Sequence, residues 1–242
     1  MWKINPVHRS AFNTAVCYGH LTGRLIKNQS DILAAFLDIY KYRRKVFGGH
    51  FCKPKGSTDI RFYNSILNKY ANVIWEYFNA KPNTVNNQNS FDGFHERICS
   101  DLQADFDVER RKHGCLLSFS YGHAQKMINM VFKYLSCYDD YDDFADLFSY
   151  CHIPIDSYIL DILNNAFHVP SIVGHTYMGL NWTSFTISEY RNIVREYRAA
   201  MRGLIGAHPW LTIDFLYWGA VPPFAPLPVT GIPVIPIPQF HT

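Results

Sequence analysis

Apolar side chains return every three or four positions through most of this 242-residue chain, and that spacing restricts the folds open to it. Residues 31–47 place Ile32, Phe36 and Ile39 on one helical face, and residues 60–78 repeat the pattern. Strict alternation of apolar and polar residues, which marks a half-buried strand, is missing over any useful length. The sequence therefore predicts an all-α fold.

Local signals place the ends of the expected helices. Ser30 suits a helix N-cap, Pro154 suits a first helical turn, and Thr186-x-x-Glu189 is a capping-box pattern. The predicted helices cover residues 31–47, 60–78, 91–112, 123–135, 144–150, 155–167, 186–203 and 210–218. Gly114 is expected to end the third of these helices, and residues 169–182 are expected to form a long loop.

Two stretches suggest how the chain is divided. Residues 81–90 are rich in Asn and contain Pro82, which predicts a loop between two lobes of one helical domain, residues 1–220. Seven of the 13 prolines lie from Pro222 to Pro238, and no charged residue follows Asp214. Proline at this density breaks a membrane helix, so we expect residues 221–242 to form an extended, proline-rich tail.

Composition indicates a globular chain, with 48% hydrophobic and 18% charged residues. The net charge is only +3, but residues 41–61 hold seven basic residues and one acid, Asp59. Residues 139–146 reverse this pattern with five aspartates and no base. Such separation lets one face bind a polyanion. The aspartate run fits no calcium loop and is expected to be a solvated acidic loop.

Nothing in the sequence indicates a metal or a cofactor. The six cysteines form no Cys-x-x-Cys pair, and the opening residues MWKINPVHRS lack the apolar stretch of a signal peptide. We therefore expect reduced thiols in a cytoplasmic, monomeric protein with no metal, no cofactor and no membrane partner.

The first stretch that indicates chemistry runs from Ser120 to Lys126. Gly122 marks a tight turn between two helices, and the N–H groups of such a turn can bind a phosphate. Lys126 lies in the first turns of the following helix, with Lys133 two turns later on the same face. An ordinary exposed helix lysine is the simpler interpretation of Lys126.

A second stretch is the tetrapeptide Ile-Pro-Ile-Asp at residues 153–156. Pro154 fixes a helix start, so Asp156 is expected in the first turn, where the helix dipole favours the ionised carboxylate. A carboxylate held ionised in this way can stabilise an oxocarbenium-like sugar as its glycosidic bond breaks. A simple helix cap is the alternative role for Asp156.

A third stretch combines four arginines with the sequence PWLTIDFLYW at residues 209–218. The arginines fall at i, i+4, i+7 and i+11, which is one helical face: Arg191, Arg195, Arg198 and Arg202. This face can bind DNA, or it can be a solvated face shared with Glu189 and Glu196. Asp214 is expected to be structural.

The order of these three stretches resembles the helix-hairpin-helix DNA glycosylases. The gap between Lys126 and Asp156 is most similar to the archaeal 8-oxoguanine glycosylase branch, and the resemblance covers roughly residues 116–218. It implies that Lys126 attacks the sugar C1′ and that Asp156 supports the transition state. The hairpin departs from the family pattern because it offers only one glycine, Gly122, and no cysteine follows Cys151 to bind an iron–sulfur cluster.

The resemblance implies that the partner is double-stranded DNA, from which a nucleotide is flipped into a pocket. Expected DNA contacts are Gly122, His123, Lys133, Arg191, Arg195, Arg198 and Arg202, and expected base-pocket residues are Tyr121, Gln125 and His152. The expected activity is excision of a damaged or modified base, such as one carried by phage DNA, with or without an AP-lyase step.

Two other functions stay open at this point. A non-catalytic DNA-binding or interaction module on the same scaffold is consistent with the arginine face and the uncharged tail. A helical RNA-cleaving toxin would use an arginine–histidine spacing such as Arg44 to His50.

Overall fold

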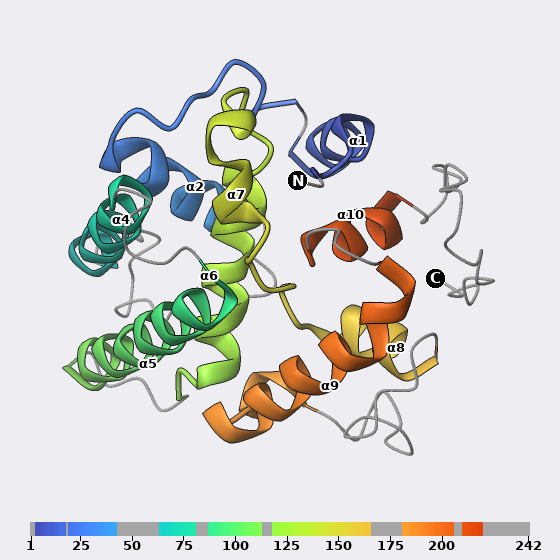
Figure 1. Cartoon of the computed structure of the whole chain (residues 1–242). Helices are drawn as coiled ribbons and strands as arrows, with labels where there is room; N and C mark the ends of the chain where they lie inside the picture. The colour runs from blue at the N-terminus through green and yellow to red at the C-terminus, as the bar shows by residue number, and fades with distance from the viewer. Residues whose placement is uncertain are drawn as a thin grey trace.

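The described part of the chain is entirely helical apart from turns and irregular connections. The computed structural model describes residues 3–17, 19–42, 63–80, 87–112, 118–165, 181–205 and 210–219, and no strand occurs among them. The predicted all-α fold is confirmed for these residues (Figure 1). None of the helices in these ranges is long and apolar enough to cross a bilayer.

Nine α-helices and two short 3-10 helices make up these ranges. They are α1 (Pro6–Cys17), α2 (Gln29–Tyr42), α4 (Asn64–Asn79), α5 (Gln88–Lys112), α6 (Tyr121–Leu135), η2 (Tyr141–Phe144), α7 (Ala145–Phe148), α8 (Ser157–Asn165), η3 (Trp182–Ser184), α9 (Ile187–Ile205) and α10 (Leu211–Gly219). Helix α1 was not indicated by the sequence pattern.

Hydrogen bonds at the helix ends correct two predicted boundaries and confirm one. The Ser30 N–H donates to Asn28 Oδ1 at 2.8 Å, so Asn28, not Ser30, caps α2. Asp156 lies just before α8 and not in its first turn, because its Oδ1 accepts from the Ile159 N–H at 3.0 Å. At α9, the Thr186 N–H donates to Glu189 Oε2 and the Glu189 N–H donates to Thr186 Oγ1, which is the predicted capping box.

Several predictions fall on residues outside these ranges. They concern the helix end at Gly114, most of the loop over residues 169–182, nearly all of the basic stretch 41–61, and the tail 221–242. Of the predicted loop at residues 81–90, residues 81–86 also lie outside these ranges, and residues 88–90 are helical because α5 begins at Gln88.

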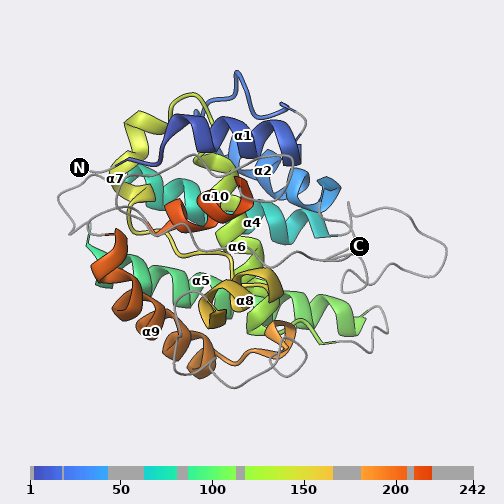
Figure 2. The same cartoon turned by 90° about the vertical axis from the view of Figure 1, so that its right-hand side faces the viewer.

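Helix α6 occupies the centre of the molecule. It packs against α2, α5, α9 and η3, and all 15 of its residues are buried (Figures 1 and 2). A helix buried on every side is usually apolar throughout. Helix α6 instead carries five polar or charged side chains within this core: His123, Gln125, Lys126, Asn129 and Lys133. Each needs a polar partner, because an unpaired buried polar group costs free energy.

Lys133 finds its partner on α10. Its Nζ lies 2.6 Å from Asp214 Oδ2, and both side chains are completely buried. The rings of Phe12 and Phe215 lie 4.0 and 5.0 Å from the ammonium. The prediction that Lys133 contacts DNA is therefore wrong, because the side chain points into the core and its charge is paired there.

Removing Lys133 is expected to be strongly destabilising. The substitution Lys133→Met leaves the Asp214 carboxylate buried without its cation, which typically costs about 3–5 kcal/mol of unfolding free energy. The double variant Lys133→Met/Asp214→Leu removes both charges and is expected to recover most of that loss. Urea unfolding at pH 7 measures both values. Equal losses in the single and double variants would contradict the ion-pair interpretation.

Candidate active site

Gly122 does not form the predicted turn between two helices, because it is the second residue of α6, and this N-terminal turn of the helix is closed by protein contacts. Ser120 Oγ accepts from the His123 N–H, and the Ser120 N–H donates back to His123 Nδ1, which forms a capping box with histidine in the usual place of glutamate. The Gly122 N–H donates to the Phe185 carbonyl at 3.2 Å. A Cβ on Gly122 would lie 1.8 Å from the Trp182 carbonyl oxygen, so the backbone of η3 packs directly on this turn.

These contacts leave no room for a phosphate at the turn. The Gly122 N–H is already used, and His123 is buried against Phe119 and Trp182. The predicted DNA contacts at Gly122 and His123 are therefore contradicted by the structure. Glycine is needed at position 122 for close packing of two backbones.

Lys126 and Asp156, the two predicted catalytic residues, are in direct contact. Lys126 Nζ lies 2.5 Å from Asp156 Oδ2, and the two side chains are 5% and 17% exposed. Lys126 projects from the second turn of α6, while Asp156 is the N-cap of α8 and keeps Oδ1 for the Ile159 N–H. The pair is thus largely shielded from water, and the aspartate is its more accessible member.

The surroundings keep Asp156 ionised. Burial alone would raise the pKa of this carboxyl, but the Lys126 ammonium and the Ile159 N–H stabilise the carboxylate more strongly. The net effect is a pKa of Asp156 below its ordinary value. At neutral pH Asp156 is therefore ionised, and its charge is balanced by Lys126.

An irregular buried segment leads up to Asp156. Residues 151–155 are all buried and are not helical. The Gln125 amide bonds both backbone groups of Ile155, and Asn129 Nδ2 donates to the Ile153 carbonyl at 3.2 Å. Gln125 was predicted to line a base pocket, but it is fully buried and its amide is occupied by these bonds. That prediction is wrong.

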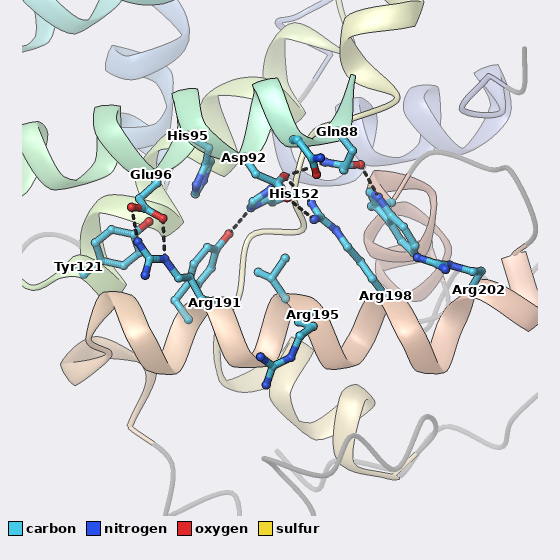
Figure 3. A pocket seen from close by; sticks show the side chains of 14 residues that line it. Gln88, Asp92, His95, Glu96, Tyr121, His152, Arg191, Arg195, Arg198 and Arg202 are labelled. Carbon is cyan, nitrogen blue, oxygen red and sulfur yellow. Dashed lines mark hydrogen bonds and ion pairs between the residues drawn. The ribbon is translucent and has the colours of Figure 1, made fainter. Parts of the chain in front are cut away.

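A chain of hydrogen bonds continues from Asn129 toward the surface. Asn129 Nδ2 lies 3.0 Å from Tyr190 Oη, and Tyr190 Oη lies 2.8 Å from His152 Nδ1. His152 Nε2 lies 2.8 Å from Asp92 Oδ1, and Asp92 receives two hydrogen bonds from the Arg198 guanidinium at 2.6 and 2.9 Å. Figure 3 shows Arg198 and His152 meeting at Asp92.

The protonation states of His152 and Asp92 determine which atoms donate and which accept in this series of hydrogen bonds. Burial lowers the pKa of His152 to about 4, in spite of the nearby Asp92 carboxylate. Burial would raise the pKa of Asp92, but His152 and Arg198 hold it well below its usual range. Neutral His152 therefore donates from Nε2 to Asp92 and accepts at Nδ1 from the Tyr190 hydroxyl.

A pocket of about 500 Å³ opens between α5 and α9. The predicted base-pocket residues Tyr121 and His152 line it, together with all four arginines of the α9 face (Figure 3). Lys126, Asp156 and Gln125 are not among its lining residues. The structure thus separates the predicted site into two parts, the Lys126–Asp156 pair and the arginine-lined pocket.

The four arginines of that pocket differ in how they are held. Arg191 forms a bidentate ion pair with Glu96 near the surface, and Arg198 is paired with Asp92 and mostly buried. Arg195 and Arg202 are exposed, and Arg195 bonds only the side-chain amide of Asn192 among the contacts described. Arg195 and Arg202 are therefore the better placed of the four to meet an external anion.

Sequence reasoning missed several residues that organise this region. Asn129, Tyr190, Asp92 and His95 all take part in the hydrogen-bonded chain, and His95 Nε2 lies 2.8 Å from Asn129 Oδ1. The available signal was the spacing of Gln125 and Asn129, two polar residues four positions apart in a helix with a largely apolar sequence. No group of three or more metal-ligating side chains occurs in the ranges that the structure covers.

Burial of neutral His152 makes stability depend on pH. Its pKa is about 4 in the folded state and 6.5 when exposed, so the unfolded chain binds more protons between these values. Burial of His152 therefore has no electrostatic cost above pH 6.5. As pH falls from 6.5 to 4, the free energy of unfolding decreases by about 3 kcal/mol. We expect His152→Gln to lose this part of the pH dependence. Urea unfolding of both proteins at several pH values tests it, and parallel profiles would contradict it.

Comparison with known proteins assigns no family to the chain. No protein-family model, no curated protein and no solved structure matches it.

Proposed function

We propose that the chain is a DNA glycosylase that cleaves the N-glycosidic bond of a damaged or modified base, such as a modified base of phage DNA. The observation that carries the proposal is the contact between Lys126 and Asp156, which are 30 residues apart in the sequence. The resemblance singled out these two residues together. Their ion pair supports the proposal, because the proposed chemistry uses an amine and a carboxylate that lie side by side.

Asp156 would act on the charge that develops in the sugar. As the bond from C1′ to the base nitrogen breaks, its electron pair leaves with the base and C1′ becomes positively charged. A carboxylate that is already ionised and fixed at a helix N-terminus can stabilise this charge without reorganising. The lowered pKa of Asp156 supports this role, because the carboxyl group is already ionised before substrate arrives.

Lys126 would supply the nucleophile in a bifunctional enzyme. As the bond from C1′ to the base breaks, the departing base would take one proton from Lys126 Nζ, and the freed amine would form a bond from Nζ to C1′. A second Nζ proton would pass to O4′ as the C1′–O4′ bond breaks, which opens the sugar ring and leaves a protonated Schiff base, while Asp156 stays ionised throughout. In a monofunctional enzyme, water would take the place of the amine at C1′ and Lys126 would act only through its charge.

The exposed side of α9 is the proposed DNA contact. Arg195 and Arg202 are seven residues apart, which places them about 10 Å apart along the helix axis and on the same face. Their exposure supports contact with two separate phosphates of a strand. Arg191 and Arg198 would contribute mainly to the local field, because each already has a carboxylate partner.

A non-catalytic DNA-binding module is the second candidate. The observation in its favour is the low exposure of Lys126 and Asp156, since a shielded ion pair can also serve the fold alone. Such a module would bind DNA in a salt-sensitive way and would release no base. A ribonuclease using Arg44 and His50 gains no support, because both lie outside the described residues.

Substitution of the pair tests the proposed chemistry. Asp156→Asn keeps the cap but removes the charge, and we expect its single-turnover excision rate to fall by about 10²–10³. Lys126→Ala is expected to abolish the complex that borohydride traps if the enzyme is bifunctional. The measurement uses duplexes that carry a panel of modified bases.

The chain offers a matched control for these variants. Lys69 and Asp105 form a 2.7 Å ion pair on the surface between α4 and α5, so Lys69→Ala removes a lysine–aspartate pair away from the site, although a more exposed one. This control is expected to excise at the wild-type rate. Full activity of Asp156→Asn would refute the proposed role of the carboxylate.

Salt dependence tests the DNA contact. Each phosphate contact contributes about 0.9 to the slope of log affinity against log salt concentration. Arg195→Gln and Arg202→Gln are each expected to reduce this slope by about one and to weaken binding to all duplex sequences alike. Arg111→Gln, an exposed arginine in the last turn of α5, is the control and should leave the slope unchanged. If Arg195→Gln and Arg202→Gln leave the slope unchanged, as the control does, this surface is excluded as the DNA contact.

A further inference from the structure

The segment before Asp156 has backbone groups that need partners. Residues 151–155 are buried without belonging to a helix, so their N–H and C=O groups cannot be satisfied within the segment as they are in a helix. Buried backbone groups are almost always paired, with side chains where no regular structure is present. For the part of the segment closest to Asp156, these side chains come from α6.

Gln125 pairs with both backbone groups of the residue before the catalytic aspartate. Its Nε2 donates to the Ile155 carbonyl at 2.7 Å, and its Oε1 accepts from the Ile155 N–H at 3.2 Å. The amide thus bonds the Ile155 backbone in the way that a neighbouring β-strand would. Gln125 is fully buried, so water cannot replace either bond.

Asn129, one turn further along α6, holds Gln125 in this orientation. Its Nδ2 lies 3.1 Å from Gln125 Oε1, 3.2 Å from the Ile153 carbonyl and 3.0 Å from Tyr190 Oη. Its Oδ1 is 2.8 Å from His95 Nε2. Because Asn129 Nδ2 serves as donor to Gln125, the oxygen of the Gln125 amide must face Asn129 and the Ile155 N–H, and its nitrogen must face the Ile155 carbonyl.

Helix α6 therefore holds Asp156 at two points. Lys126 binds the carboxylate, and the adjacent residue Gln125 fixes the backbone of Ile155. We propose that Gln125, oriented by Asn129, is a positioning residue that sets where the Asp156 carboxylate stands relative to the sugar C1′. This inference rests on the proposed glycosylase function. Catalytic groups must be held close to their productive geometry, and a displacement of about 1 Å can cost about 10²-fold in rate.

Two substitutions of Gln125 separate positioning from packing. Gln125→Met has a similar shape but removes both bonds to Ile155, and we expect excision to slow by about 10²-fold while DNA affinity stays unchanged. Gln125→Glu reproduces the donor and acceptor of the amide only while its carboxyl is protonated. We expect this variant to excise at nearly the wild-type rate at acid pH and to lose activity as the buried carboxyl ionises.

A matched control comes from another buried amide that bonds the backbone. Asn13 on α1 accepts from the Leu21 N–H at 3.1 Å and donates to Thr22 Oγ1 at 2.9 Å. Asn13→Leu removes comparable bonds far from Asp156, so it is expected to lower stability and leave the excision rate unchanged. If Asn13→Leu slows excision as much as Gln125→Met does, the inference is overturned.

A second measurement does not depend on enzymatic activity. The Asp156 carboxyl carbon is followed by NMR during an acid titration of wild type, Gln125→Met, Gln125→Glu and Asn13→Leu. We expect the titration midpoint to rise in Gln125→Met, because a displaced carboxylate loses alignment with Lys126 and the Ile159 N–H. It should stay at the wild-type value in Asn13→Leu.

These outcomes distinguish the two proposals. If no DNA is a substrate but the midpoint rises only in Gln125→Met, the glycosylase proposal fails and the positioning of Asp156 by Gln125 stands. If Gln125→Met excises at the wild-type rate, or if its midpoint is unchanged, the positioning role is refuted. Should Gln125→Met fail to fold, the pH-dependent activity and titration of Gln125→Glu decide the question in its place.

Discussion

Complete burial of α6 is the constraint on which the rest of the structure depends. A helix with no exposed face must supply every polar side chain with a partner inside the protein. In helix α6, His123 bonds the N-cap Ser120 and Gln125 bonds the backbone of Ile155. Lys126 and Lys133 form ion pairs, and Asn129 begins the series of hydrogen bonds to Tyr190. The partners beyond Ser120 come from the segment that leads into α8, from α9 and from α10, so these polar contacts tie the three elements to the central helix.

The same constraint prepares the proposed chemistry. Lys126 and Asp156 are shielded enough for their charges to interact strongly, yet Asp156 keeps some access to solvent. Burial raises the pKa of Asp214, whereas the pKa of Asp156 is lowered, although each carboxylate is paired with a lysine of α6. The N-cap bond and partial exposure distinguish Asp156 from its fully buried counterpart. One helix thus carries a structural ion pair and a proposed catalytic one.

Periodicity in the sequence predicted helices over most of α5, α6 and α9, and a local motif predicted the capping box at Thr186. The roles of Lys126 and Asp156 were implied only by the family resemblance. Local patterns could not show which face of α6 would be covered. Lys133 lies on the same side of α6 as Lys126, as predicted. Its partner Asp214 is 81 residues later in the sequence, so the pattern around Lys133 could not show that this lysine is buried. Gly122 was predicted to mark a turn between two helices, but it lies within the first turn of α6, and η3, which covers it, is about 60 residues away. Contacts between distant segments decided each of these cases.

Release of free base is the most direct test of the central claim, that the Lys126–Asp156 pair breaks an N-glycosidic bond. Genomic DNAs that carry different base modifications would be incubated with wild-type protein or with Asp156→Asn, and the liberated bases would be identified by mass spectrometry. The account predicts that the wild-type protein releases one class of base, leaving an equal number of abasic sites, and that Asp156→Asn releases almost none. Binding of these DNAs without release of any base would contradict it.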